Sequence, residues 1–415
     1  MPIAVFPQRV PSELLNSILD DLESKSDLLA LRTTCKVLHG VTTPRSFRVL
    51  DISRKKGGAD AAISIFGVSE LAQYVEEIIL QASHGEYLID ATSDGGRSNF
   101  AEAPTSQEEE GDTVEDTASI FGHLSKLPNL RSLRLLFPNQ YEDAEEYNED
   151  EVPESEARKL QLEIIQAVAT VTPVPSLKNF EIYNLVCLPI EINNSPGFKN
   201  FLKGLESVYV QVVLTSEESF YYYERLLDFY ERDIPVFAQA PQETLTSLTL
   251  SSNVLNPGPV LESFWKETTM PNLHDLHFVR FAFHHNIMNP APVDPTCLEW
   301  LVLRHAATLQ SLKFTGCTID MGQTVQGTWN VRSWNQVLKA FREKLTGLKE
   351  FILDPLPGRN EADPEEYNGY SWLLIESGYI QLFDVDDDRL PPLDADLAAY
   401  EELQQNIRKR LAVAA

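Results

Sequence analysis

One spaced pattern of apolar residues recurs along most of this chain and restricts the folds that it can adopt. An apolar residue is followed by a second one three positions later and by a third one two positions after that. The pattern occurs at Val75/Ile78/Leu80, Leu130/Leu133/Leu135, Leu177/Phe180/Ile182, Leu205/Val208/Val210, Leu245/Leu248/Leu250, Leu273/Leu276/Phe278, Leu309/Leu312/Phe314 and Leu348/Phe351/Leu353. The alternation at the end of each copy predicts a short strand with one buried face.

Helix-like stretches stand between the copies, at 118–126, 158–170, 260–267, 296–305 and 333–344. A short strand followed by a helix, many times over, resembles a leucine-rich repeat. Two copies complete that motif at its ninth position, with Asn253 and Cys317. The spacing between copies is irregular, so the predicted fold class is α/β with a degenerate leucine-rich-repeat-like solenoid. A doubly wound α/β sheet also fits the alternation of strand and helix.

The first 50 residues carry more apolar surface than so short a unit can bury by itself. Helical spacing places Leu14, Leu15, Ile18, Leu19 and Leu22 on one face, after a proline that suits a helix start. A second helix from Ser26 or Asp27 would align Leu28, Leu31, Cys35 and Leu38, with Leu29 beside them, and a short third segment at 44–50 adds Phe47 and Val49. A free unit of about 40 residues rarely holds a core without a partner. Some of these leucines are therefore expected to contact something outside the segment.

The same residues resemble an F-box. The family pattern is matched by Pro11, Glu13, Leu14-Leu15, Ile18-Leu19, Asp27-Leu28-Leu29, Arg32 and Cys35-Lys36, and 44–50 looks like the segment that follows in many fungal members. Two departures occur, because Leu38-His39 stands where many members have Trp, and Thr34 replaces a common Val. A plain helical hairpin packed on its own chain is the alternative.

The resemblance implies a three-helix F-box at residues 1–50 that docks on a Skp1-like adaptor and, through it, on a cullin. The implied adaptor-binding residues are Pro11, Leu14, Leu15, Ile18, Leu19, Leu22, Leu28, Leu29, Arg32, Cys35, Lys36 and Phe47. The rest of the chain would select an unknown protein substrate. The expected function is a non-catalytic, substrate-recognition subunit of a cullin–RING (SCF-type) ubiquitin ligase. A scaffold that acts outside ubiquitination, or an enzyme formed by the irregular insertions, is the competing hypothesis.

Charge narrows the class of partner. The net charge of −28 argues against nucleic acid and against an anionic membrane surface. Residues 1–56 are instead slightly basic, with nine basic and six acidic side chains, which suits an acidic partner. Two acidic stretches, 85–117 and 138–157, are predicted to be unstructured, solvated insertions. Two roles stay open for them: selection of a basic substrate, or phosphorylation at Ser93, Thr105, Ser106 or Thr113.

Motifs for catalysis, metals or cofactors are lacking in the sequence. The four cysteines (Cys35, Cys187, Cys297 and Cys317) form no close pair, which predicts a reduced chain without a metal site, in the cytoplasm and/or the nucleus. His274 and His277 would point to opposite faces of a strand, so they cannot share a metal ion. The start of the chain does not read as a signal peptide, and no apolar run approaches a membrane span. No cofactor and no enzymatic activity are expected.

A recognition surface follows from the alternation along each predicted strand. The residues between the buried positions are Arg134, Glu181, Tyr209, Thr249, His277, Lys313 and Ile352, with Tyr183, Asp275 and Asp354 on the same face. The predicted substrate-binding residues are Arg134, Glu181, Tyr183, Tyr209, Asp275, His277 and Lys313. Aromatic and arginine residues are favoured as interface anchors, so this mixed set suits a protein surface.

The domain boundaries follow from these patterns: 1–50 for the F-box and 51–384 for the repeats. Residues 385–415 form an acidic linker and a C-terminal helix, in which Leu397, Tyr400, Leu403, Ile407 and Leu411 recur at helical spacing. A solenoid needs a cap over its last apolar face, so this helix is predicted to be a cap or a docking tail.

Overall fold

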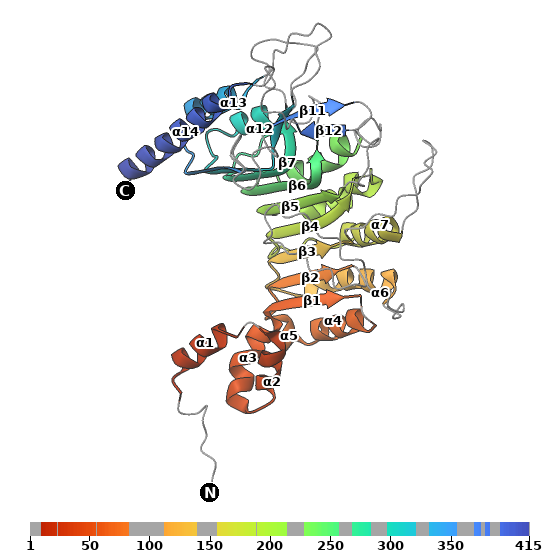
Figure 1. The fold of residues 1–415 in the computed structure, drawn as a ribbon. Helices are drawn as coiled ribbons and strands as arrows, with labels where there is room; N and C mark the ends of the chain where they lie inside the picture. The colour runs from red at the N-terminus through yellow and green to blue at the C-terminus, as the bar shows by residue number, and fades with distance from the viewer. Residues whose placement is uncertain are drawn as a thin grey trace.

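The fold is mixed α/β and is built on one open, largely parallel sheet (Figure 1). The computed structural model describes residues 10–22, 24–54, 56–82, 112–138, 156–187, 189–213, 228–256, 268–283, 297–320, 332–354, 369–374, 378–381 and 391–414. Its strands are β1 Val49–Ser53, β2 Glu77–Gln81, β3 Ser132–Leu136, β4 Asn179–Val186, β5 Ser207–Val213, β6 Ser247–Asn256, β7 Asp275–Phe283, β8 Ser311–Thr315, β9 Thr318–Asp320, β10 Glu350–Asp354, β11 Tyr370–Leu374 and β12 Gly378–Gln381.

Strand order follows chain order over most of the sheet. From β1 to β7 each strand pairs in parallel with the next one along the chain. At β7 the sheet forks: its first half pairs with β8, which pairs with β10, and its second half pairs with β9, followed by β11 and the antiparallel β12. A doubly wound sheet reverses its strand order at a switch point. The sequential order therefore excludes that alternative.

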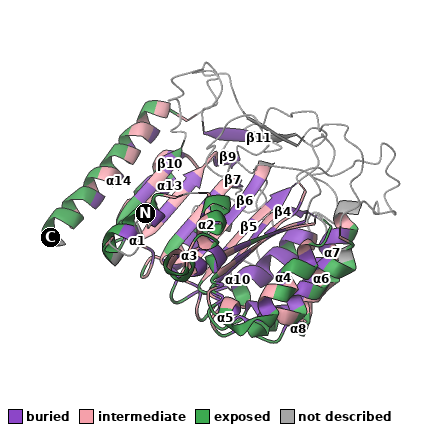
Figure 2. Cartoon of the chain, turned by 90° about the horizontal axis from the view of Figure 1, so that it is seen from below, coloured by how far each residue is buried: buried purple, intermediate pink, exposed green. Residues whose placement is uncertain are grey.

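The repeated apolar pattern defines the register of the sheet. The second apolar residue of each copy pairs with its counterpart on the next strand, in the row Ile78, Leu133, Phe180, Val208, Leu248, Leu276, Leu312 and Phe351. All the apolar residues of the eight copies are buried, with at most 4 % of their surface exposed. Seen from below, the strands alternate between buried and half-buried residues (Figure 2). The predicted strands and their buried faces are thus confirmed.

A ninth copy, missed by the sequence analysis, opens the sheet. Phe47, Leu50 and Ile52 have the same spacing and are buried, and Leu50 pairs with Ile78 of the next strand. Phe47 and Leu50 fall in the predicted third segment at 44–50 and Ile52 falls just beyond it, so this strand spans the predicted boundary at residue 50. The last N-terminal helix instead runs directly into β1, without a linker.

Three copies share one backbone feature just after the strand core. Their eighth positions, Asn184, Arg280 and Gly316, have φ values of 59°, 59° and 61°. A left-handed residue turns the chain out of the strand direction, which glycine tolerates best. Cys317 follows Gly316 at the ninth position of the last of these copies. Its Sγ lies 3.4 Å from the carbonyl oxygen of Phe278. The ninth position thus bonds to backbone in this copy.

Helices connect the strands and cover the apolar face. They are α4 Gly58–Gly67, α5 Ser69–Ala72, α6 Val114–Ser119, the 3₁₀ helix η2 Ile120–Lys126, α7 Glu156–Ala169, the 3₁₀ helix η3 Glu191–Asn194, α8 Pro196–Leu202, the π-helical turn η5 Phe229–Asp233, α10 Ile234–Gln239, α12 Cys297–Arg304, α13 Trp334–Lys344 and α14 Leu393–Ala414. Figure 1 shows α4, α6 and α7 on one side of the first strands. The predicted helices 158–170, 296–305 and 333–344 correspond to α7, α12 and α13. The stretch 118–126 is mostly 3₁₀, and 260–267 lies outside the described residues.

The end of the first acidic stretch is ordered, contrary to the prediction for 85–117. The carboxylate of Asp112 accepts hydrogen bonds from the backbone N–H groups of Gly57 (2.5 Å) and Ala59 (2.8 Å), at the start of α4. Thr113 then caps α6 through a reciprocal capping box with Asp116. These bonds satisfy helix N-termini, which compensates for ordering the segment. Residues 85–111 and 139–155 of the two acidic stretches lie outside the described residues.

Three N-terminal helices form a small separate cluster: α1 Ser12–Asp20, α2 Lys25–Arg32 and α3 Lys36–Arg48. The second helix is shorter than predicted and the third is longer, because the chain turns at Thr33–Cys35 and continues as helix through Pro44. Cys35 is therefore the N-cap of α3 and does not continue the apolar stripe of α2, as was predicted. Arg45 of α3 donates to Asp20 of α1 at 2.8 Å, which joins the first helix to the other two.

The C-terminal helix α14 packs against α13. Leu403 and Ile407 are buried between them, at 0 % and 3 % exposed. The Asp396 carboxylate accepts a hydrogen bond from the backbone N–H of Asn335 (2.6 Å), at the start of α13, and one from the Tyr370 hydroxyl (2.6 Å). The apolar side of α14 thus covers the last helix of the sheet, as a cap does.

Candidate functional site

The half-buried residues between the apolar positions form one continuous row across the sheet. In strand order, the paired residues are Asp51, Ile79, Arg134, Glu181, Tyr209, Thr249, His277, Lys313 and Ile352. Tyr183, Asp275 and Asp354 lie two positions away on the same strands, so they share this face. The fold therefore brings together the seven substrate-binding residues predicted from the sequence. We call this surface, with the paired residues two positions before and after the row, the polar sheet face.

Two carboxylates neutralise the arginine of this face. Arg134 Nε lies 2.8 Å from Glu77 Oε1 and 3.1 Å from Glu181 Oε2, on the strands to either side. Glu181 also accepts a hydrogen bond from the Tyr183 hydroxyl at 2.9 Å. The sequence analysis missed Glu77, although its place two residues before the centre of β2 puts it on the same face. The side-by-side arrangement leaves Arg134 little charge to offer a ligand.

An aromatic pair adjoins this ion-pair cluster. The rings of Tyr183 and Tyr209 lie 4.6 Å apart at a tilt of 31°. Burial raises the pKa of both hydroxyls, and the negative charge of Glu181 raises them further. Both phenols are therefore neutral at physiological pH. Together they offer a flat, half-buried aromatic surface at the middle of the polar sheet face.

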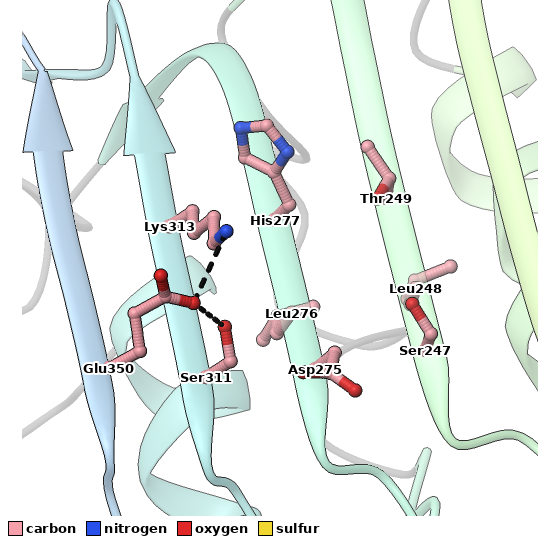
Figure 3. Close-up of a pocket in the computed structure, with 9 residues that line it drawn as sticks. All are labelled: Ser247, Leu248, Thr249, Asp275, Leu276, His277, Ser311, Lys313 and Glu350. Carbon is pink, nitrogen blue, oxygen red and sulfur yellow. Dashed lines mark hydrogen bonds and ion pairs between the residues drawn. The ribbon is translucent and has the colours of Figure 1, made fainter. Parts of the chain in front are cut away.

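A shallow hollow of about 230 Å³ lies next along the face, over β6, β7, β8 and β10 (Figure 3). Its polar lining is Ser247, Thr249, Asp275, His277, Ser311, Lys313 and Glu350. Glu350 Oε2 accepts a hydrogen bond from the Ser311 hydroxyl at 2.8 Å and pairs with Lys313 Nζ at 3.2 Å. Both contacts hold the pKa of Glu350 below its usual range. Small-molecule pockets usually span about 300–1,000 Å³, so the hollow has the size for a side chain.

His277 and the missed residues complete the hollow. His277 Nε2 lies 3.0 Å from Thr315 Oγ1. Ser247, Ser311 and Glu350 were not predicted as site residues, because on β6, β8 and β10 the position two residues before the centre was left out. Each lies two residues before that centre. The alternation of the strands was the signal that could have found them.

A second candidate surface lies on the N-terminal helices. Leu14, Ile18 and Leu29 are exposed by 58 %, 53 % and 37 %, and Val37, which was not predicted, is exposed by 36 %. By contrast, Leu15, Leu19 and Leu28 are buried together as the core of the three helices, with Leu22 packed partly against them. The predicted adaptor-binding leucines thus divide into an outward set and a structural set.

The remaining residues predicted for adaptor binding have mixed positions. Arg32 lies over the Phe47 ring at 5.0 Å from its centroid and donates to Thr43 Oγ1 at 3.0 Å. Phe47 belongs to the core of the sheet. Pro11 and Lys36 are exposed, whereas Cys35 is half-buried. Arg32 and Phe47 therefore join the helical unit to the sheet.

Nucleophiles and metal ligands are sparse in the described part of the chain. Burial raises the pKa of the Cys317 thiol to about 12 and that of Cys187 well above its usual value, so neither is a reactive thiolate. Among the described residues, no three His, Cys, Asp or Glu side chains are grouped to hold a metal ion. Within those same ranges, no helix has the length and apolar character needed to span a bilayer.

Comparison with known proteins leaves the family undefined. No protein-family model matches the chain, and a search of curated proteins finds no significant relative.

Proposed function

We propose that this chain is an F-box protein with degenerate leucine-rich repeats, acting as a substrate-recognition subunit of an SCF-type ubiquitin ligase. The observation that carries the proposal is the outward position of Leu14, Ile18 and Leu29, which match the F-box pattern and are exposed although a small core lies beneath them. Large apolar side chains gathered on the outside of a small unit mark a contact surface for another protein. The proposed partner is a Skp1-like adaptor.

The sheet supports the second half of the proposal. The sheet contains nine copies of one apolar pattern, which pair in parallel, in register and in chain order. A leucine-rich solenoid would require this arrangement. Their polar sheet face is broad and has a mixed composition, which suits a protein substrate. α14 covers the last helix in the way that a terminal cap covers a solenoid.

The mechanism that we infer is proximity. The ligase machinery would dock on α1–α3 and the target on the polar sheet face, so ubiquitin transfer becomes effectively intramolecular. The direct junction between α3 and β1 favours this role. Arg32 reaches Thr43 and Phe47, and Lys25 Nζ donates to the carbonyl oxygen of Val49 at 3.0 Å, so side chains brace the junction. The proposed compartment is the cytoplasm and/or the nucleus, where such ligases act.

The test is co-purification of the adaptor with matched surface variants. A chain with Leu14→Asp and Ile18→Asp should lose the Skp1-like adaptor, because each buried leucine-sized contact contributes about 1.5–3 kcal/mol. A control chain with Leu411→Asp and Val413→Asp, also exposed apolar positions, should retain it. Both chains should keep the far-ultraviolet circular dichroism of the wild type. Unchanged adaptor recovery with the first variant would refute the proposal.

A scaffold that binds the adaptor outside ubiquitination is the second candidate. The exposed Leu14, Ile18 and Leu29 support it equally, because they concern the adaptor alone. Recovery of a cullin together with the adaptor favours the ligase subunit. Recovery of the adaptor without a cullin, under conditions where a known F-box protein captures both, favours the scaffold.

A further inference from the structure

We propose that the polar sheet face binds a basic, extended segment of its protein partner, with one lysine or arginine side chain in the hollow beside Asp275. The inference rests on the proposed function, in that it names the class of substrate for the same face. The charges, the hollow and the aromatic pair of that face support it.

The charges of the face are unequal. Its three rows of paired residues contain the carboxylates Asp51, Glu77, Glu181, Asp275, Glu350 and Asp354, and the cations Arg134 and Lys313. Both cations are already paired, Arg134 with two carboxylates and Lys313 with one. The surplus is negative, so the field over the face attracts a cationic ligand and repels an anionic one.

Of the two carboxylates that line the hollow, Glu350 is paired with Lys313 and Asp275 is not. Asp275 lies at the start of β7 between Ser247 and Ser311, its paired neighbours on β6 and β8 (Figure 3). Within the described residues, neither an ion pair nor a hydrogen bond engages its carboxylate. An ammonium or guanidinium group needs several acceptors at once. The Asp275 carboxylate and the two serine hydroxyl oxygens provide them on one wall of the hollow.

The aromatic pair provides a second subsite for a cation. Tyr209 and Tyr183 lie beside the cluster of Glu77, Glu181 and Arg134, in which two carboxylates face one cation. The net charge of the cluster is negative, and an aromatic face next to a negative charge attracts lysine and arginine side chains. β5 and β7 are two strands apart, so Tyr209 and Asp275 are separated by roughly 12 Å at ordinary strand spacing. An extended segment covers this in about four residues. The preferred ligand therefore carries two basic residues about four positions apart.

A phosphorylated segment is the opposite possibility, since Lys313 and His277 also line the hollow. Lys313 is compensated by Glu350, which itself is held ionised by Ser311 and Lys313. A phosphate in the hollow would lie near two carboxylates, Asp275 and Glu350. Like charges at this range are unfavourable, so the structure disfavours a phosphopeptide.

The experiment compares three fluorescein-labelled peptides on the full chain by fluorescence anisotropy. Each is a short glycine–serine peptide with two variable positions about four residues apart, which hold lysine, glutamate or phosphoserine. The lysine peptide should bind, more weakly as salt rises, and the other two should not. Asp275→Asn should weaken its binding about tenfold, because the amide oxygen still accepts a hydrogen bond but the opposite charge that strengthens it is removed. The control Asp394→Asn, an exposed carboxylate on α14, should bind as the wild type does.

Two results would overturn the inference. One is tighter binding of the phosphoserine peptide. The other is lysine-peptide binding that Asp275→Asn does not change, which would assign the attraction to charge elsewhere on this acidic chain. The assay contains no adaptor, so it is independent of the proposed role in ubiquitination. A chain that selects lysine peptides but never captures a Skp1-like adaptor would disprove the proposed function and leave the inference standing.

Discussion

The carboxyl group of Asp233 should make the stability of this protein fall as the pH rises toward neutrality. Asp233 ends the π-helical turn η5 and is only 2 % exposed. Its oxygens accept hydrogen bonds from the Ile190 N–H at 2.9 Å and from Asn194 Nδ2 at 3.1 Å. Burial outweighs these contacts and raises the pKa of Asp233 from 3.8 to about 7.

The sign of the effect follows from proton binding. Between pH 4 and pH 7 the folded chain holds a proton on Asp233 that the unfolded chain has released, so folding is favoured most at the acidic end. Each pKa unit corresponds to about 1.4 kcal/mol, which makes the full span about 4 kcal/mol. With a pKa of 3.8 in the unfolded chain and about 7 in the folded chain, the free energy of unfolding falls by about 2.5 kcal/mol between pH 5 and pH 8. Above the folded pKa the contribution is gone.

Urea unfolding of the wild type and Asp233→Asn at both pH values isolates this group. Asparagine keeps the shape of the side chain but does not titrate, so the wild type should lose about 2.5 kcal/mol relative to the variant between pH 5 and pH 8. Glu231 is an exposed carboxylate on the same turn. The control variant Glu231→Gln should therefore have the same free energy of unfolding as the wild type at pH 5 and at pH 8. If the free energies of unfolding of the wild type and Asp233→Asn differ by the same amount at pH 5 and pH 8, this role of Asp233 is refuted.

Two further changes test packing. Leu403→Ala should lower the free energy of unfolding by about 2–5 kcal/mol, because the side chain is fully buried between α14 and α13, whereas Leu411→Ala, exposed by 42 %, should stay within about 0.5 kcal/mol. Similar losses for the two would contradict the packing of α14. Gly197→Ala would place a Cβ 2.2 Å from the Ala169 carbonyl oxygen and should cost about 1–3 kcal/mol in thermal unfolding experiments, while Gly122→Ala, with open space around it, should cost nothing. A stable Gly197→Ala chain would show that α7 and α8 pack less closely than described.

The sheet could be predicted from sequence because one local rule repeats. The spacing of the apolar residues identifies the strands, and their alternation identifies both faces. The same rule would have found the first copy, Phe47, Leu50 and Ile52, had Phe47 and Leu50 not been assigned to the tail of the helical unit. It would also have found Glu77 and Glu350, which lie two residues before the centres of β2 and β10.

Other features depend on contacts between distant parts of the chain. Helical spacing groups Leu14 with Leu15, and only the packing of α1 on its neighbours decides that one is exposed and the other buried. Arg134 reads as an interface anchor in the sequence, but the lateral register brings two carboxylates to it. The burial of Asp233 likewise has no local signature, because its partners Ile190 and Asn194 lie some 40 residues earlier in the sequence, before β5.

Hydrogen–deuterium exchange of the full chain, with and without a purified Skp1-like adaptor, tests the central claim most directly. Docking on Leu14, Ile18 and Leu29 would slow exchange in α1 and α2, since bound helices open less often. The strands β4 to β7 should exchange at the same rate in both samples. Protection confined to the N-terminal helices is the predicted result. Unchanged exchange in α1 and α2 at saturating adaptor, or protection on the polar sheet face instead, would contradict the account.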